Sequence, residues 1–132
     1  MTKLLCLFLL FMPVISPAAP PGGDPIATTA GLIKKMSLHE FAKMFASSID
    51  LTILDKEDVY SAAQAEIVLA EFFKSNPVKS VTVLHRVTSN PNIRFAVFTV
   101  VTANGTYRTS VSLKLTDGTF LVNELRIETQ KD

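Results

Sequence analysis

Alternating hydrophobic and polar residues dominate the C-terminal half of the chain. Four runs with this pattern predict antiparallel strands at about residues 79–89, 93–103, 106–116 and 119–129. The dipeptides Asn104-Gly105 and Asp117-Gly118 separate the last three runs, and each suits a two-residue type I′ turn with positive φ at both positions. The sequence therefore predicts two β-hairpins that share a central strand.

Capping signals and helical spacing predict helices in the N-terminal half. Asp24 can cap a short helix that runs through Ile33. Ser37 and Glu40 have the spacing of a capping box, in which the serine accepts a backbone N–H and the glutamate reaches back. The helix that they open is expected to end near residues 47–48.

A third helix has the clearest boundaries. A short strand at residues 49–54 and a charged turn at residues 55–58 precede it. Ser61 and Gln64 form a second capping box at its start, and Asn76-Pro77 ends it. Its apolar stripe is expected to consist of Ala65, Val68, Leu69, Phe72 and Phe73.

The register of the strands predicts which side chains share a face of the sheet. Val111 should lie opposite Glu124, and His85 should lie opposite Ala96 across a four-residue loop. The helices are expected to cover a concave face that carries Val81, Val83, His85, Ala96, Phe98, Val100, Val111, Leu113, Phe120 and Val122. The far end of the same face is expected to hold Glu124, Arg126 and Glu128.

The opposite face of the predicted sheet is too apolar for a fully solvated surface. It mixes polar residues such as Arg86 and Arg108 with Phe95, Val97, Leu125 and Ile127. One interpretation is a homodimer in which two sheets pack face to face. The other is a β-bulge that shifts the last strand and buries its leucines in the main core. The pattern leaves both open.

The first residues have the organisation of a signal peptide. Lys3 precedes an apolar run at residues 4–12, and Ser16-Pro17-Ala18 supplies small residues for cleavage after Ala18. The alternative is a membrane anchor, but the run is shorter than the roughly 20 residues that span a bilayer. We expect a signal peptide at residues 1–18, a flexible tether at 19–23 and one domain at 24–132.

Composition narrows the partners of the exported chain. The one cysteine, Cys6, lies inside the predicted signal peptide, so the mature domain should have no disulfide. Removing Lys3 leaves 12 basic and 12 acidic side chains. A net charge near zero argues against nucleic acid or an anionic membrane surface as the partner. No stable membrane span is expected after cleavage.

Three segments carry a resemblance to known proteins, and they are Ser48-Ile49-Asp50-Leu51-Thr52-Ile53-Leu54-Asp55, Tyr60-Ser61-Ala62-Ala63-Gln64-Ala65-Glu66 and Leu125-Arg126-Ile127-Glu128. With the element order, they resemble an uncharacterised family of small exported bacterial proteins with the nuclear transport factor 2-like, or cystatin-like, cone fold. The resemblance implies an α+β domain in which three N-terminal helices and a short strand pack on a bent four-stranded antiparallel sheet. It also implies export to the bacterial periplasm or the medium, and it supplies no catalytic residues.

His85 is the candidate for catalysis inside the cone. Relatives of the fold include ketosteroid isomerase, scytalone dehydratase and polyketide cyclases, which use an Asp, His or Tyr there. By that resemblance His85 could act as a general base, with Tyr60 or Tyr107 donating to a developing oxyanion. The alternative is a core histidine that a neighbouring acceptor satisfies.

Glu124 and Arg126 are the candidates for ligand binding, together with His85. The two residues point the same way from one strand, and Arg126 could offer a forked donor to a polar or anionic ligand. The alternative is an ion pair that closes the end of the core. The acidic turn at residues 55–58 lacks the ligand spacing of a calcium loop, so no metal and no cofactor is expected.

These observations favour a non-enzymatic exported module that binds a small ligand or an envelope protein with the concave face of its sheet. The first alternative is an isomerase- or dehydratase-type enzyme with His85 as general base. A structural accessory protein of the envelope is the second. No paired acid and base lies beside a pocket in the predicted arrangement, which is why the binding module is preferred.

Overall fold

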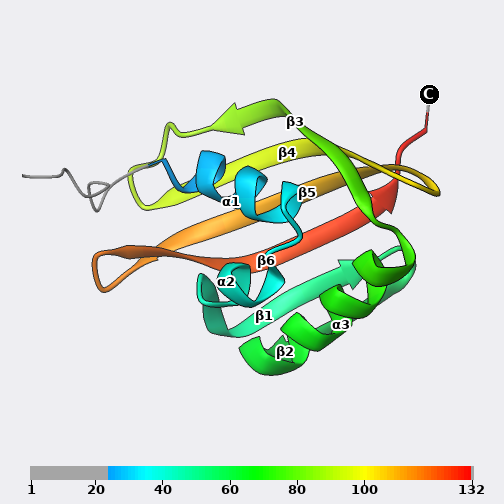
Figure 1. Ribbon diagram of the computed structural model, residues 1–132. Coiled ribbons are helices and arrows are strands. Elements are labelled where there is room, and N and C mark those ends of the chain that lie inside the picture. The colour runs from blue at the N-terminus through cyan, green and yellow to red at the C-terminus, as the bar shows by residue number, and fades with distance from the viewer. Residues whose placement is uncertain (1–23, 132) are drawn as a thin grey trace, which may run out of the picture.

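One mixed sheet of six strands organises the computed structural model, which describes residues 24–131 (Figure 1). The predicted signal peptide and tether, residues 1–23, lie outside the described residues. The elements are α1 (Pro25–Lys34), α2 (Leu38–Ala42), β1 (Phe45–Ile53), β2 (Lys56–Ser61), α3 (Ala62–Ser75), β3 (Val78–Val87), β4 (Ile93–Thr102), β5 (Gly105–Thr116) and β6 (Thr119–Thr129). Their order in the sheet is β2-β1-β6-β5-β4-β3, and only β1 and β6 run parallel.

The α+β class and the four long C-terminal strands are confirmed, but the predicted sheet is too small. Residues 55–58 were expected to form a turn, and the turn is confined to Leu54 and Asp55. Lys56–Ser61 instead pairs with β1 as an edge strand, so the sheet has six strands. Charged residues are common on edge strands, where they hinder pairing with other chains. That is why β2 does not have the sequence pattern of a strand.

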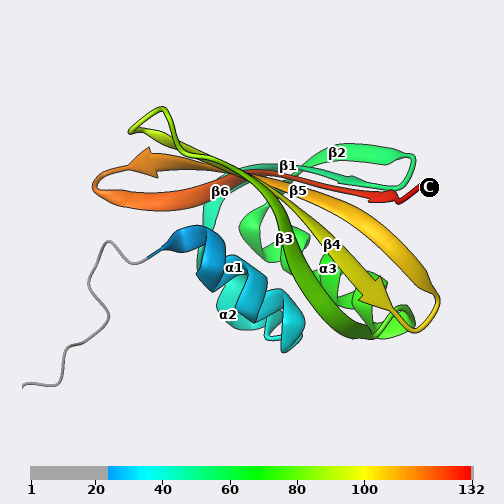
Figure 2. The ribbon, with the colours of Figure 1, turned by 90° about the horizontal axis from the view of Figure 1, so that it is seen from above.

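The helices all lie on one face of the sheet (Figure 2). Helix α1 packs against β3 and β4, α3 packs against β1 and β2, and α2 contacts both other helices. The opposite face carries no helix in the described part of the chain. We call these the covered face and the uncovered face.

All three predicted helix starts are confirmed, and two of them have the predicted side-chain cap. Oδ1 of Asp24 accepts the N–H of Ile26 at 3.0 Å and caps α1. At α3, the N–H of Gln64 donates to Oγ of Ser61 and the N–H of Ser61 donates to Oε1 of Gln64, both at 3.2 Å. Ala65, Leu69 and Phe73 of α3 are buried, as the apolar stripe predicted.

The capping box predicted at Ser37 is wrong. The Ser37 side chain makes no capping hydrogen bond, and α2 ends at Ala42 instead of continuing to residues 47–48. The chain turns so that the Met44 carbonyl accepts the N–H of Val122 at 2.7 Å, and β1 starts at the next residue. Pairing with β6 therefore overrides the local helical signal.

One of the two predicted type I′ turns is confirmed. Asp117 and Gly118 have φ of 50° and 83°, as that turn requires. In the other hairpin Thr102 pairs with Gly105, so the turn residues are Ala103 and Asn104. Oγ1 of Thr102 accepts the N–H of Asn104 at 3.2 Å and donates to the carbonyl of Gly105 at 2.8 Å. These two bonds hold the turn one residue earlier than the sequence predicted.

Two bulges decide which side chains face the helices. A register shift in β3 places His85 opposite Val97 and Arg86 opposite Ala96. A second shift, in β6, places Leu125 opposite Val111. One extra residue in a strand moves every following side chain to the other face. The predicted placement of four residues on the covered face is therefore wrong. The residues that lie on the uncovered face instead are His85, Glu124, Arg126 and Glu128.

The β-bulge alternative for the last strand is confirmed. Leu125 and Ile127 are 1% and 0% exposed, and they join the core beneath the helices. The other residues predicted for the covered face do lie there, including Phe98, which is fully buried. The centre of the cone is filled by large side chains, among which are Phe41, Phe73, Phe98, Ile33, Ile49, Leu51, Leu69 and Leu113.

Candidate functional site

A cleft opens on the covered face, between α3 and the β1–β2 hairpin. Its volume is about 450 Å³, within the range of small-molecule sites in proteins. We call it the α3 cleft. It is lined by Leu51, Ile53, Lys56, Tyr60, Val68, Glu71, Phe72, Ser75 and Asn76.

Apolar side chains form the inner wall of the α3 cleft. Leu51 and Ile53 alternate along β1, so both point to the covered face. Val68 and Phe72 lie four residues apart on α3, so they lie on the same side of that helix. The cleft therefore offers a hydrophobic surface that the filled centre of the cone does not.

Polar groups stand at the rim of the α3 cleft. Lys56 begins β2, and Glu71 lies on the last turns of α3; both side chains are exposed. Neither forms an ion pair with another residue in the range 24–131. The hydroxyl of half-buried Tyr60 adds a neutral donor and acceptor to the same cleft. The rim can thus meet a polar group of either charge.

Asn76 fixes the end of the cleft. Its Nδ2 donates to the Phe72 carbonyl at 2.9 Å, and its Oδ1 accepts the hydroxyl of Tyr107 at 3.2 Å. The Tyr107 ring packs edge-on against Phe72 at a centroid distance of 5.2 Å. Tyr107 therefore supports the wall from behind and does not line the cleft. Of the three catalytic candidates, Tyr60 alone is among the lining residues.

Glu124 and Arg126 lie together, but on the uncovered face. With Phe95, Ser110 and Ser112 they line a shallow depression of about 170 Å³. Nη1 of Arg126 donates to Oε2 of Glu128 at 3.1 Å. That hydrogen bond raises the pKa of the Arg126 guanidinium, and the charges of two further glutamates add to the effect. Arg126 is therefore held positive within an acidic surrounding.

His85 is far from the covered face that was predicted for it. It is exposed, and its neighbour on β4 is Val97. Three strand spacings separate it from Arg126, which corresponds to about 14 Å. The structure thus brings Glu124 and Arg126 together and leaves His85 apart from them.

A larger hollow lies at one end of the sheet. It has a volume of about 640 Å³ and is lined by Leu54, Asp55, Arg108, Glu128, Thr129 and Lys131. Four of these six side chains are charged, and only Leu54 is apolar. Ligand sites are mostly lined by apolar side chains with a few polar groups, which describes the α3 cleft better. We therefore take the α3 cleft as the candidate site.

Neither a metal cluster nor a spanning helix is found in the described residues. In the range 24–131 no three His, Cys, Asp or Glu side chains converge as they would around a metal ion. Within the same range, no helix has the length and hydropathy needed to cross a bilayer.

The chain belongs to the family described as a domain of unknown function, DUF4783, whose model matches residues 26–128. It is similar to a family member from Bacteroides uniformis at 23% identity and a TM-score of 0.78, covering 83% of this chain and all of that one. A member from Bacteroides fragilis is 27% identical with a TM-score of 0.72, covering 76% of this chain and 94% of that one.

The wider structural neighbours have the nuclear transport factor 2-like and cystatin-like folds. One is a domain of unknown function with a cystatin-like fold from Nostoc punctiforme, at 9% identity and a TM-score of 0.64. That match covers 81% of this chain and 74% of the other. No curated protein matches the chain. The predicted resemblance to an uncharacterised family with this fold is confirmed.

Sequence reasoning missed the polar rim of the α3 cleft. Val68 and Phe72 were expected on an apolar stripe, but Lys56 was assigned to a turn. Lys56 and Glu71 come together only because β2 pairs with β1 and α3 then runs back along the hairpin. The signal that could have revealed this strand is the run of six residues, 55–60, between the predicted strand at 49–54 and the Ser61 cap, because that length leaves room for a returning strand.

Proposed function

We propose that this domain is a non-enzymatic binding module that holds a small molecule in the α3 cleft. The observation that carries the proposal is the combination of an apolar inner wall with Lys56 and Glu71 at the rim. The proposed binding site lies on the concave, helix-covered face, which is the face that the sequence predicted. It is formed by β1, β2 and α3 rather than by the centre of the sheet.

The residues that line the α3 cleft indicate which class of ligand would fit it. The wall of Leu51, Val68 and Phe72 suits an apolar body such as an aromatic ring or a short alkyl chain. Lys56 suits an anionic head group and Glu71 a cationic one, so a zwitterionic or singly charged amphiphile fits both parts of the cleft.

Binding is preferred over catalysis because of where His85 lies. The enzyme hypothesis needs that imidazole inside the cone and beside a donor, and it lies on the uncovered face. Tyr60 lines the cleft, but neither a histidine nor an aspartate is among the lining residues. The site has the hydroxyls of Tyr60 and Ser75 and two exposed charges, without a buried base.

We propose further that the module acts in the bacterial periplasm or outside the cell. The signal-like organisation of residues 1–18 supports this location. The family members from Bacteroides support a bacterial context. Signal cleavage would be tested by N-terminal sequencing of the exported chain, with Ala19 as the expected first residue.

Fluorescence titration with anilinonaphthalene sulfonate tests the cleft, since this probe has an aromatic body and one anionic group. Val68→Trp fills the cleft and should weaken binding by about tenfold. Ile67→Trp is the matched control, because Ile67 is the adjacent residue on α3, is 61% exposed and does not line the cleft. Equal affinity of both variants, each with the thermal unfolding of the parent, would overturn the proposal.

A further inference from the structure

The uncovered face of the sheet has a charge pattern that identifies its partner. We infer that it binds a second copy of the chain across a twofold axis that runs along the strands between β5 and β6. The half of the face built by β2, β1 and β6 then lies over the half built by β5, β4 and β3 of the partner subunit. This interface is separate from the α3 cleft, which is on the other side of the sheet.

The uncovered face is large enough for a stable interface. Figure 2 shows the sheet from its edge, with all helices on one side and the other side bare. Five strand spacings of about 4.8 Å and strands of about nine residues give a face of about 24 Å by 30 Å. That is roughly 700 Å², close to the roughly 800 Å² that each partner buries in a standard interface.

Charge is divided between the two halves of the uncovered face. The β2–β1–β6 half presents one cation, Arg126, and four carboxylates, which are Asp50, Glu57, Glu124 and Glu128. The β5–β4–β3 half presents Arg108, Lys114 and His85, without a carboxylate in its strands on this face. An acidic half beside a basic half is complementary to itself after a twofold rotation about the line between them.

The innermost pair shows this most clearly. Arg108 on β5 and Glu128 on β6 are direct cross-strand neighbours on either side of the proposed axis. Rotation about that axis places Arg108 over Glu128 of the partner subunit, and the contact occurs twice. Arg108 forms no ion pair with any residue of 24–131, so its guanidinium has donors to offer.

The outer parts of the face also match. Val59 on β2 is 60% exposed, and Val87 on β3 is 40% exposed at the opposite edge. The two residues lie on one row across the sheet, because successive cross-strand pairs link them. The row is Val59, Asp50, Glu124, Ser112, Phe95 and Val87. The rotation brings these apolar side chains together. The arrangement also agrees with the usual packing of two sheets face to face, in which the strand directions differ by no more than about 30°.

The other twofold arrangement is disfavoured by the same charges. An axis across the strands would place each strand over its own copy, with β6 on β6 and β1 on β1. Asp50, Glu57 and Glu124 would then face the acidic half of the partner subunit. Like charges juxtaposed across an interface oppose association, so the axis along the strands is selected.

Light scattering of the exported and purified chain at micromolar concentrations tests the inference. The parent should have the mass of a dimer, and Arg108→Glu should raise the dissociation constant by about tenfold or more. Arg108→Glu combined with Glu128→Arg restores opposite charges across the axis and should recover the dimer. Lys74→Glu is the control, because Lys74 is an exposed residue of α3 on the covered side of the sheet. It makes the same charge change and should leave the mass unchanged.

Three results would overturn the inference, provided that thermal unfolding shows every variant folded. A monomeric parent would exclude the second copy as the occupant of this face. A dimer that Arg108→Glu does not weaken would place the interface elsewhere. Failure of the double reversal to recover the dimer would exclude the proposed axis.

Discussion

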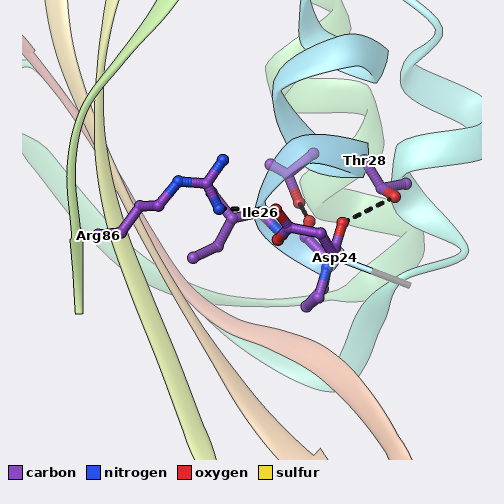
Figure 3. A network of polar contacts seen from close by, with 6 residues as sticks. Asp24, Ile26, Thr28 and Arg86 are labelled. Carbon is purple, nitrogen blue, oxygen red and sulfur yellow. Dashed lines mark hydrogen bonds and ion pairs between the residues drawn. The ribbon is translucent and has the colours of Figure 1, made fainter. Parts of the chain in front are cut away.

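Nη1 of Arg86 lies 2.6 Å from Oδ2 of Asp24 and joins strand β3 to the N-terminal cap of α1 (Figure 3). The other carboxylate oxygen of Asp24 caps the helix at Ile26, so one side chain fixes both the start and the position of α1. The pair exists because the β3 bulge turns Arg86 to the covered face, opposite Ala96. The sequence placed Arg86 on the other face.

Replacing Asp24 separates its two roles. Asp24→Asn keeps a capping oxygen and removes the charge, and it should lower the free energy of unfolding by about 0.5 kcal/mol, as for other half-exposed ion pairs. Asp24→Ala removes the cap as well and should cost about 1–2 kcal/mol. Urea unfolding measures both. Equal losses for the two variants would show that the cap contributes nothing.

The Asp24 pair also predicts a dependence on pH. Burial raises the pKa of Asp24, but hydrogen bonds from Arg86 and from backbone N–H groups of α1 outweigh it, so the pKa is lowered. Folding therefore favours the carboxylate, and its contribution is present above the unfolded pKa of about 3.9 and is lost as the pH falls through the folded pKa. The stability difference between the parent and Asp24→Asn should vanish in acid. A difference that persists at low pH would assign it to packing.

Thr109 carries a buried hydroxyl that costs stability. It is 1% exposed, and its Oγ1 has no hydrogen-bond partner among the described residues. Thr109→Val keeps the shape and removes the unsatisfied group, so it should raise the free energy of unfolding by about 1 kcal/mol. Thr102→Val is the control, because the Thr102 hydroxyl makes two hydrogen bonds in the β4–β5 turn and its loss should destabilise. A stability loss in both variants would mean that Thr109 has a partner.

Leu54 has a strained backbone at the β1–β2 turn. Its φ is +58°, a region that costs roughly 1–2 kcal/mol for a residue with a side chain, and its N–H donates to the Ile127 carbonyl at 2.8 Å. The side chain is 42% exposed, so little packing is lost on removing it. Leu54→Gly should stabilise the fold by about 0.5–1 kcal/mol in urea unfolding. The neighbouring Asp55→Gly, where φ is negative, should destabilise it.

Local chemistry accounts for the parts of the fold that the sequence predicted. The Ser61 capping box, the Asp24 cap and the turn at Asp117-Gly118 each depend on residues close in the chain. The two bulges, at Leu84 in β3 and at Asn123 in β6, could not be predicted in this way, since no residue near either position signals an extra residue in the strand. One alternative, a bulge in the last strand, was nevertheless inferred from the excess of leucine and isoleucine on the wrong face.

Long-range pairing determines the candidate site, which is why sequence reasoning could describe only part of it. The β2 strand depends on β1, and β1 is fixed by its parallel pairing with β6, at the far end of the chain. Lys56 and Glu71 meet at one cleft through those contacts. The prediction placed Glu124 and Arg126 correctly relative to each other, because two residues apart on one strand always share a face, and it assigned them to the wrong one.

Backbone amide NMR tests the central claim most directly, because it shows where a small amphiphile binds. Titration with anilinonaphthalene sulfonate should saturate and should shift amides that border the α3 cleft, such as Leu51, Tyr60 and Phe72. The depression at Ser110, Ser112 and Glu124 provides the comparison within the same spectrum. Shifts confined to α3 and the β1–β2 hairpin are the predicted result. Shifts confined to the uncovered face, or shifts that do not saturate, would contradict the assignment of the α3 cleft as the binding site.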